Sequence, residues 1–206
     1  MGILKKLIGK IRNSVEGNGR IGKTGYKLDE FTAIQVGGVF NISYLKSETC
    51  EAEITTDENL LEYIRCEVRN STLILDHTQS LNPSDGLNVK IRSRTLSLVE
   101  ISGACSGLFD KLDGDIEFSV SGAAKIKCRG ESPRVKAVIS GAANLEAREL
   151  KARDVEINLS GAGKTTVFAD NSLTVSLSGA GKVVYYGNPV TVKKSVTGVG
   201  RISAGK

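Results

Sequence analysis

Residue types on which metal sites and many enzymes depend are scarce in this sequence. Its 206 residues include no Trp, three Pro and a single His, His77. Four Cys are present, but they form neither a Cys-x-x-Cys pair nor another spacing typical of zinc ligands. We therefore expect no metal and no cofactor.

Long apolar runs are also missing. No segment is apolar enough for a signal peptide or long enough to cross a membrane. Taken literally, this predicts a cytoplasmic protein with reduced thiols, either free or peripheral on the inner face of the membrane. If an export signal has been removed from the chain, the predicted location is instead the cell surface.

The positive charge is confined to one end of the chain. Residues 1–26 hold six Lys or Arg and one acidic residue, whereas the other 180 residues hold 22 of each sign, so that the body is neutral. The net charge of +5 therefore describes a tail, and it does not indicate a nucleic-acid-binding protein.

Glycine is abundant, with 23 residues, and much of it belongs to a repeat. The triplet Ser-Gly-Ala recurs at intervals of 18 to 20 residues, and Thr197-Gly198-Val199 is a sixth, degenerate copy. The five complete copies begin at Ser102, Ser121, Ser140, Ser160 and Ser178. Apolar and polar residues alternate before each copy, which predicts a strand with one face turned inward.

A repeat of about 19 residues is too short for a βαβ unit, which needs roughly 30. It is also too short for a propeller blade, which needs roughly 40 to 45. It suits one turn of a parallel β-helix, in which each coil buries its apolar face against the next. We expect an all-β, single-stranded parallel β-helix over residues 27–206, with irregular capping coils in 27–95 and regular coils in 96–206.

Particular motifs resemble a known family. They are Phe31 with Ile34-x-Val36-x-Gly38, then Leu73-Ile74-Leu75, the Ile-Ser-Gly-Ala units and Tyr186-Gly187-Asn188-Pro189. Over about residues 28–206 the chain resembles the putative auto-transporter adhesin head GIN domain family. This resemblance implies a right-handed parallel β-helix without catalytic residues.

Residues 1–26 are predicted to form a short basic amphipathic helix over 3–15 and a flexible glycine-rich linker over 16–25. Two roles remain open for the helix: binding an anionic membrane, or covering the open end of the solenoid. The candidate membrane-binding residues are Ile3, Leu4, Lys5, Lys6, Leu7, Ile8, Lys10, Ile11 and Arg12.

Three patterns that suggest chemistry are better explained by the repeat, by the flexible linker and by a surface turn. Residues 161–166 spell the end of a phosphate-binding loop, but the same Gly-Ala-Gly-Lys letters recur one coil later at 179–182. Residues 17–22 spell a dinucleotide fingerprint without a preceding strand. The acidic cluster of Asp110, Asp113, Asp115 and Glu117 fits a surface turn better than a polysaccharide-cleaving site.

One column of residues is predicted to bind anions. Four positions after the first residue of each triplet, stacked coils would align Ser106 and Asn144 with four cations. The candidate anion-binding residues are Lys125, Lys164, Lys182 and Arg201. A solvated surface is the plainer alternative.

The sequence thus predicts a protein that is not an enzyme. We expect a scaffold or adhesion-type solenoid that self-associates and is tethered to a membrane by its N-terminal helix. A module that binds acidic glycan or anionic lipid is the alternative, followed by a polysaccharide-active enzyme on the same fold. Nucleic acid is not an expected partner.

Overall fold

The structure, a computed structural model, describes residues 14–205. The predicted helix falls almost entirely outside the described residues, and with it all nine candidate membrane-binding residues. Where the two overlap the prediction is wrong, because Ser14 and Val15 belong to a strand, β1 (Ser14–Glu16). The predicted all-β solenoid with coils of about 19 residues is confirmed, with about six turns.

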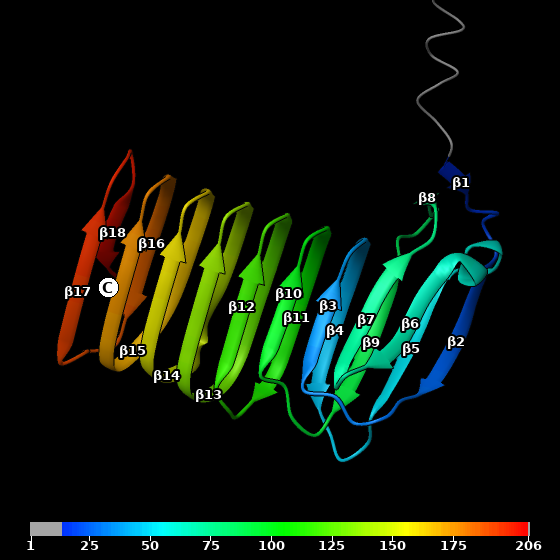
Figure 1. Ribbon diagram of the computed structural model, residues 1–206, viewed down its shortest axis with the longest axis horizontal. Helices are drawn as coiled ribbons and strands as arrows, with labels where there is room; N and C mark the ends of the chain where they lie inside the picture. The colour runs from blue at the N-terminus through cyan, green and yellow to red at the C-terminus, as the bar shows by residue number, and fades with distance from the viewer. Residues whose placement is uncertain (1–13, 206) are drawn as a thin grey trace, which may run out of the picture.

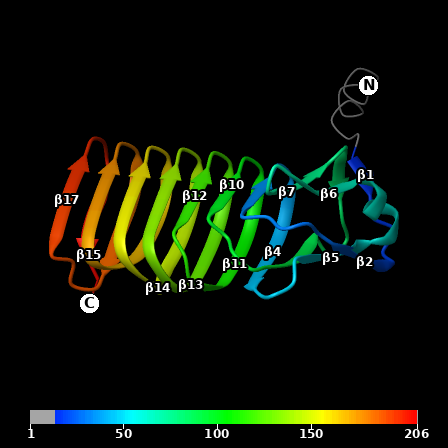
Figure 2. The same ribbon diagram turned by 60° about the horizontal axis from the view of Figure 1, so that its bottom comes forward.

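Each coil crosses two sheets that face one another, so that the solenoid is a flattened tube (Figures 1 and 2). We call the sheet nearest the viewer in Figure 1 the front sheet and the other the rear sheet. Along the chain, a front strand leads into the Ser-Gly-Ala corner, and a rear strand leads away from it. Three long strands bend around the opposite corner and belong to both sheets: β13 (Ala123–Ile139), β14 (Ala142–Leu159) and β15 (Ala162–Leu177).

The remaining strands belong to one sheet each. The front sheet also contains β6 (Ile64–Arg69), β7 (Thr72–His77), β3 (Ala33–Val36), β10 (Leu98–Ile101), β12 (Ile116–Val120) and β17 (Thr191–Val196). The rear sheet also contains β2 (Ile21–Lys27), β5 (Glu51–Asp57), β9 (Asn88–Ser93), β4 (Val39–Lys46), β11 (Ala104–Leu112), β16 (Ala180–Tyr186) and β18 (Arg201–Ala204). A short 3-10 helix, η1 (Glu58–Tyr63), and a strand β8 (Ser80–Asn82) that pairs with β1 complete the fold.

The glycine at each Ser-Gly-Ala corner is required by the closeness of the neighbouring coil. A Cβ on Gly122 or Gly141 would overlap the carbonyl oxygen of the corner glycine one coil earlier. The next residue's N–H donates to that same oxygen, as in Ala142 N–H to Gly122 O at 3.0 Å. The corners are thus held at backbone hydrogen-bonding distance, which leaves no room for a side chain.

The core lies between the two sheets and consists of columns of equivalent residues. Val99 stacks on Phe118, which stacks on Ala137, and all three are fully buried. The Phe118 ring also meets the Phe109 ring edge-on from the rear sheet, with 5.6 Å between ring centroids. Each coil buries its apolar face against its neighbours, as the alternating pattern predicts.

The N-terminal coils do not stack in sequence order, which the sequence did not reveal. The coil made of β3 and β4 lies between β7 and β9 on one side and β10 and β11 on the other. After β4 the chain therefore runs through β5 to β9 on the N-terminal side of this coil. It then crosses the coil and begins β10 on the other side. Strands β2, β5 and β6 pair antiparallel with their neighbours and close this end of the parallel stack.

The prediction of a flexible linker over residues 16–25 is wrong, because β2 and a buried carboxylate order this segment. Asp57 is fully buried and accepts hydrogen bonds from the Gly19 N–H (2.6 Å) and from the Ser84 N–H and hydroxyl (2.8 Å each). The hydrogen bond from the Ser84 N–H is the main reason that the pKa of Asp57 lies below its usual value. The glycines here serve local packing, since a Cβ at Gly17 would collide with Asp57.

The opposite end of the solenoid is open within residues 14–205. Strand β17 pairs only with β15, strand β18 pairs only with β16, and every residue of β17 is exposed. Lys194 occupies the inward position that Val175 fills one coil earlier, and its ammonium lies 3.0 Å from the Tyr185 hydroxyl.

Replacing Gly141 by Ala should destabilise the solenoid by about 1–3 kcal/mol, because the added methyl group has no space beside the Gly122 carbonyl. The free energy of unfolding from a urea titration measures this effect. Gly114→Ala is the matched control, since no atom lies within 4 Å of a Cβ there. Equal losses in the two variants would contradict the role given to the corner.

Candidate anion-binding groove

The rear sheet carries one continuous column of exposed polar residues on its outer surface. Parallel pairing places one such residue on each of seven consecutive coils, with the side chains on the same face. From the N-terminal end they are Asn41, Ser106, Lys125, Asn144, Lys164, Lys182 and Arg201. We call this the polar column, and it contains all four predicted anion-binding residues.

A hollow of about 960 Å³ follows the polar column across the rear sheet. Three of the predicted residues, Lys125, Lys164 and Lys182, line it together with Asn41, Ser106 and Asn144. Arg201 lies opposite Lys182 in the strand register, on the last coil, but is not part of the lining. We call this hollow the rear groove.

Small apolar side chains form a row beside the rear groove. Two residues before each of the first six members of the polar column, the register aligns Val39 with a row of alanines. The alanines are Ala104, Ala123, Ala142, Ala162 and Ala180. A second, shallower hollow of about 390 Å³ lies over the first three of these alanines. The candidate surface therefore combines a polar column with a flat apolar row.

The cations of the polar column have no acidic partner within residues 14–205. No carboxylate of this part of the chain lies within ion-pair distance of Lys125, Lys164, Lys182 or Arg201. Lys164, Lys182 and Arg201 follow one another on adjacent coils, roughly 4.8 Å apart. Like charges placed directly opposite on adjacent strands repel, so an anion bound here would relieve an existing cost.

The neighbouring residues Lys127, Arg129 and Glu146 also line the rear groove, but their charges are neutralised. Lys127 lies 3.7 Å from Glu146 and 3.3 Å from Glu149, and Arg129 lies 3.0 Å from Glu149. The hydrogen bond from Lys127 is the main cause that lowers the pKa of the Glu149 carboxyl. The polar column therefore differs from these neighbouring residues, among which carboxylates neutralise the cations.

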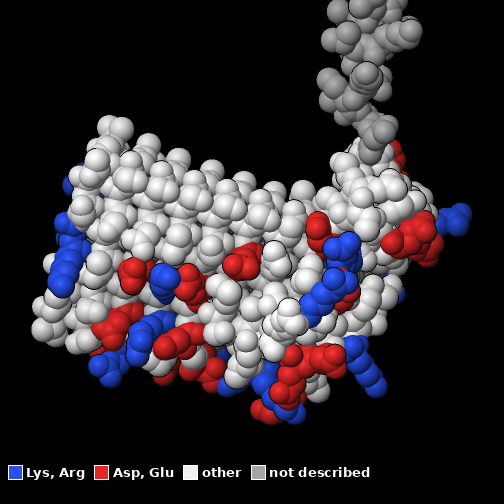
Figure 3. Space-filling model, viewed as in Figure 1, with Lys and Arg blue, Asp and Glu red and all other residues white. Residues whose placement is uncertain are grey.

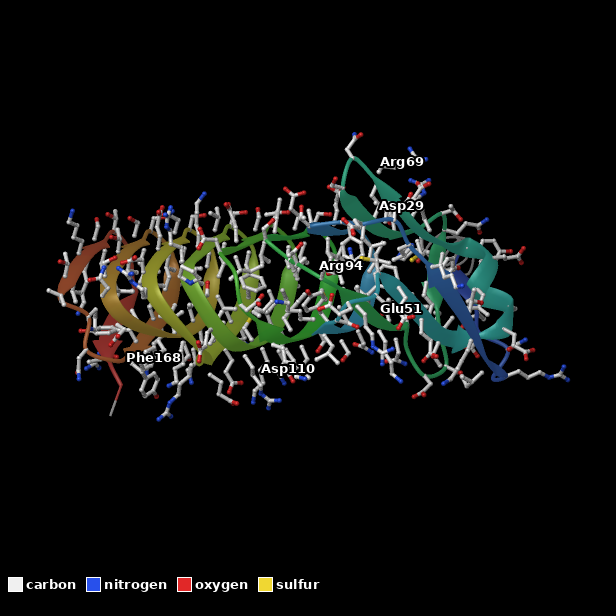
Figure 4. The ribbon with its side chains drawn as sticks, turned by 90° about the horizontal axis from the view of Figure 1, so that it is seen from below. Asp29, Glu51, Arg69, Arg94, Asp110 and Phe168 are labelled. Carbon is white, nitrogen blue, oxygen red and sulfur yellow. The ribbon has the colours of Figure 1, made fainter. Side chains whose placement is uncertain are left out.

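Aromatic rings and cations meet near the lower corner, where Arg148 and Tyr186 line the rear groove. The Arg148 guanidinium lies 4.0 Å from the centre of the Tyr186 ring, and the Lys151 ammonium lies 3.9 Å from that of Phe168. Seen from below, Phe168 projects from the outside of the solenoid (Figure 4). Because these rings already contact cations, their faces are engaged within the protein.

The other sequence patterns do not assemble into a reactive site. In the acidic cluster Asp113 pairs with Lys46, Asp115 lies 3.9 Å from Arg134, and Glu117 lies 3.1 Å from Lys136. The Gly-Ala-Gly-Lys segment forms a solenoid corner and the start of β15, and His77 packs against the Phe40 ring. No metal-binding group of His, Cys, Asp and Glu occurs within residues 14–205.

The front sheet offers a different surface. Charged side chains cross its middle and lower parts, while the upper part, toward the Ser-Gly-Ala corner, is uncharged (Figure 3). Glu117 and Lys136 neutralise one another across two adjacent coils of this sheet. The front sheet therefore has no counterpart to the polar column among the residues that the structure describes.

Sequence reasoning missed Asn41, Arg148 and Tyr186 as groove residues. Asn41 belongs to the displaced coil, which has Gly37-Gly38-Val39 at its corner and so escapes a search for Ser-Gly-Ala. Arg148 and Tyr186 meet across two coils, and only the three-dimensional stack brings them together. The spacing of Gly38 before Asn41 was the one signal that could have revealed the first of these.

A family model described as putative auto-transporter adhesin, head GIN domain, matches residues 30–189. The chain belongs to this family. The match covers most of both sheets and confirms the resemblance seen in the motifs. No curated protein matches the chain.

Solved structures support the same fold for this GIN-domain protein. A putative adhesin from Bacteroides fragilis is 23% identical with a TM-score of 0.72, covering 93% of this chain and 100% of its own. A putative adhesin from Parabacteroides distasonis is 19% identical with a TM-score of 0.58, covering 94% and 100%. A putative lipid binding protein from the same species is 21% identical with a TM-score of 0.50, also covering 94% and 100%.

Proposed function

We propose that this GIN-domain protein is a non-catalytic, adhesion-type solenoid that holds a negatively charged ligand in its rear groove. The observation that carries the proposal is the row of uncompensated cations at Lys164, Lys182 and Arg201 on adjacent coils. The family description supports attachment to a surface but names no partner. The absence of paired free carboxylates in the acidic cluster favours binding over polysaccharide cleavage.

Electrostatics explain why the rear groove would select anions. Cations on one concave strip concentrate anionic ligands and speed their association, and the effect weakens with salt. Lys125 extends the positive strip beyond the first three cations, with Asn144 between as a neutral hydrogen-bonding residue. On the front sheet Glu117 and Lys136 neutralise one another on adjacent coils, and the described residues form no row of like charges comparable to the polar column there.

Attachment to a membrane is a second part of the proposal and depends on the N-terminal segment. Ile3, Leu4, Leu7, Ile8 and Ile11 recur at helical spacing among basic residues, which is the pattern of a helix that binds anionic bilayers. In the described part of the chain no helix is long or apolar enough to span a membrane. Such a tether would place the protein peripherally on a bilayer, with the solenoid free to hold its ligand.

Replacing Lys182 by Glu should weaken binding to an acidic polysaccharide by at least about tenfold, equivalent to about 1.4 kcal/mol. The reversed charge would leave Lys164 and Arg201 each facing a carboxylate in place of a cation. Calorimetric titration with polygalacturonate at low salt measures the effect, with dextran as the neutral probe. Lys193→Glu on the front sheet is the matched control with the same change in net charge. Failure of the unmodified protein to prefer polygalacturonate over dextran would contradict the proposal.

Replacing Leu7 and Ile11 together by Glu should abolish binding to vesicles that contain phosphatidylglycerol, because the apolar face of the helix would then carry charge. Cosedimentation with such vesicles, and with neutral phosphatidylcholine vesicles, measures this effect. Lys182→Glu should leave vesicle binding intact if the tether and the rear groove are separate. Loss of binding in that variant alone would identify the groove as the lipid site and overturn the tether.

A further inference from the structure

The polar column has a composition that points to the kind of anion it holds. Of its seven residues four are cations and three are neutral amide or hydroxyl side chains, and none is acidic. Coils in a parallel sheet are roughly 4.8 Å apart, so the part from Lys125 to Arg201 extends over about 19 Å along the solenoid axis. A single small anion could contact only one or two of these residues at a time.

We infer that the ligand is a linear acidic polysaccharide lying along the polar column, parallel to the solenoid axis. This inference rests on the proposed function and adds to it the class and the direction of the ligand. Carboxylate or sulfate groups would pair with the lysines, and hydroxyl groups would bond to Ser106 and to the amide of Asn144. The flat row of alanines beside the column would contact the apolar C–H faces of the sugar rings.

Other linear or extended anions fit the rear groove less well. Single-stranded nucleic acid needs open aromatic faces for its bases, but Arg148 already lies on the Tyr186 ring. An acidic peptide that adds as a strand needs a free sheet edge, whereas β14 and β15 pair on both sides. A flat bilayer cannot enter the hollow of about 960 Å³ in which the lysines lie.

Affinity should therefore increase with the length of the probe until the polar column is filled. The experiment titrates the full chain with galacturonic acid, short oligogalacturonates and polygalacturonate, at equal concentrations of carboxylate. The single variants Lys125→Ser, Lys164→Ser and Lys182→Ser should each weaken the longest probe by a similar factor. Lys193→Ser on the front sheet is the control and should not change the affinity.

The outcomes separate this inference from the proposed function. Absence of binding by every acidic probe overturns both. Binding that is equally strong for galacturonic acid and polygalacturonate, or that depends on one lysine alone, overturns the linear ligand and leaves the anion site in place. Equal affinity for a thymidine oligonucleotide of matched charge overturns the polysaccharide class.

A second inference comes from the open end of the solenoid. The column of inward residues Val99, Phe118, Ala137, Ile157 and Val175 is fully buried, and Lys194 continues it on the last coil. The Lys194 ammonium lies 4.5 Å from the centre of the Tyr185 ring and donates to the hydroxyl of that residue. A cation at the end of an apolar column cannot be covered by another coil without being buried.

We propose that Lys194 guards the edge formed by β17 against pairing with a second copy of the chain. Proteins commonly protect exposed sheet edges with inward-pointing charged residues. The edge would otherwise favour addition, because Val192 and Val196 of the same strand are 40% and 46% exposed. Self-association, which the open end suggests, would then have to use another surface.

Lys194→Val should make the protein associate, because it completes the apolar column at a free edge. Sedimentation velocity over a range of concentrations measures this, with a concentration-dependent rise in the sedimentation coefficient as the expected result. Lys193→Val, one residue earlier and facing outward, is the matched control and should behave as the unmodified protein. Lys194→Thr is a smaller change and should give weaker association. This variant replaces Lys194→Val in the test if Lys194→Val does not fold. Sedimentation of both Lys194 variants identical to that of the control would overturn the guarding role.

Discussion

The whole structure depends on backbone hydrogen bonds that join each coil to the next in register. At the corner this spacing is set by pairs such as Ala123 N–H to Gly103 O, at 3.0 Å. Once the corners are fixed, the residues on both sides of each corner lie directly over their counterparts one repeat away, and the register shifts only near the opposite corner. The core, the charges and the candidate ligand site are all columns because the backbone permits no other arrangement.

Stacking equivalent residues in a column repeats the burial or the charge of one coil on every neighbouring coil. Inside, it turns modest side chains such as Val99 and Ala137 into a continuous buried core that contains no Trp. Outside, it brings equal charges together, and the fold responds in two ways. Glu117 and Lys136 alternate in sign and neutralise one another, whereas Lys164 and Lys182 do not. Because the same fold readily supplies alternating signs, the unneutralised column is better explained by a ligand than by indifference to charge.

The sequence was most informative where the repeat is regular. The Ser-Gly-Ala spacing and the alternation before it predicted the corners, the inward faces and the alignment of Lys125, Lys164 and Lys182. These features depend on local periodicity, and parallel stacking converts them directly into contacts. The same reasoning explained why the Gly-Ala-Gly-Lys segment is a corner and not a phosphate-binding loop.

The sequence was least informative where contacts join distant segments. The displaced coil of β3 and β4 has no Ser-Gly-Ala, and its place in the stack follows from pairing with β7 and β10, far along the chain. Residues 16–25 contain glycines that predict flexibility, but pairing of β2 with β5 and the buried carboxylate of Asp57, nearly forty residues away, order them. Neither feature has a periodic signal, so neither could be derived without the fold.

The two ends of the solenoid differ in how they limit pairing at their sheet edges. A parallel stack necessarily exposes unpaired backbone groups at its first and last coils. At the N-terminal end, antiparallel strands such as β2 replace the parallel geometry, so that a further parallel coil has no matching template. At the other end the parallel geometry continues through β17, and a single charge at Lys194 interrupts the apolar column instead. Because one substitution would remove that charge, whereas the antiparallel cap involves several strands, the C-terminal edge is where self-association should be easiest to switch on.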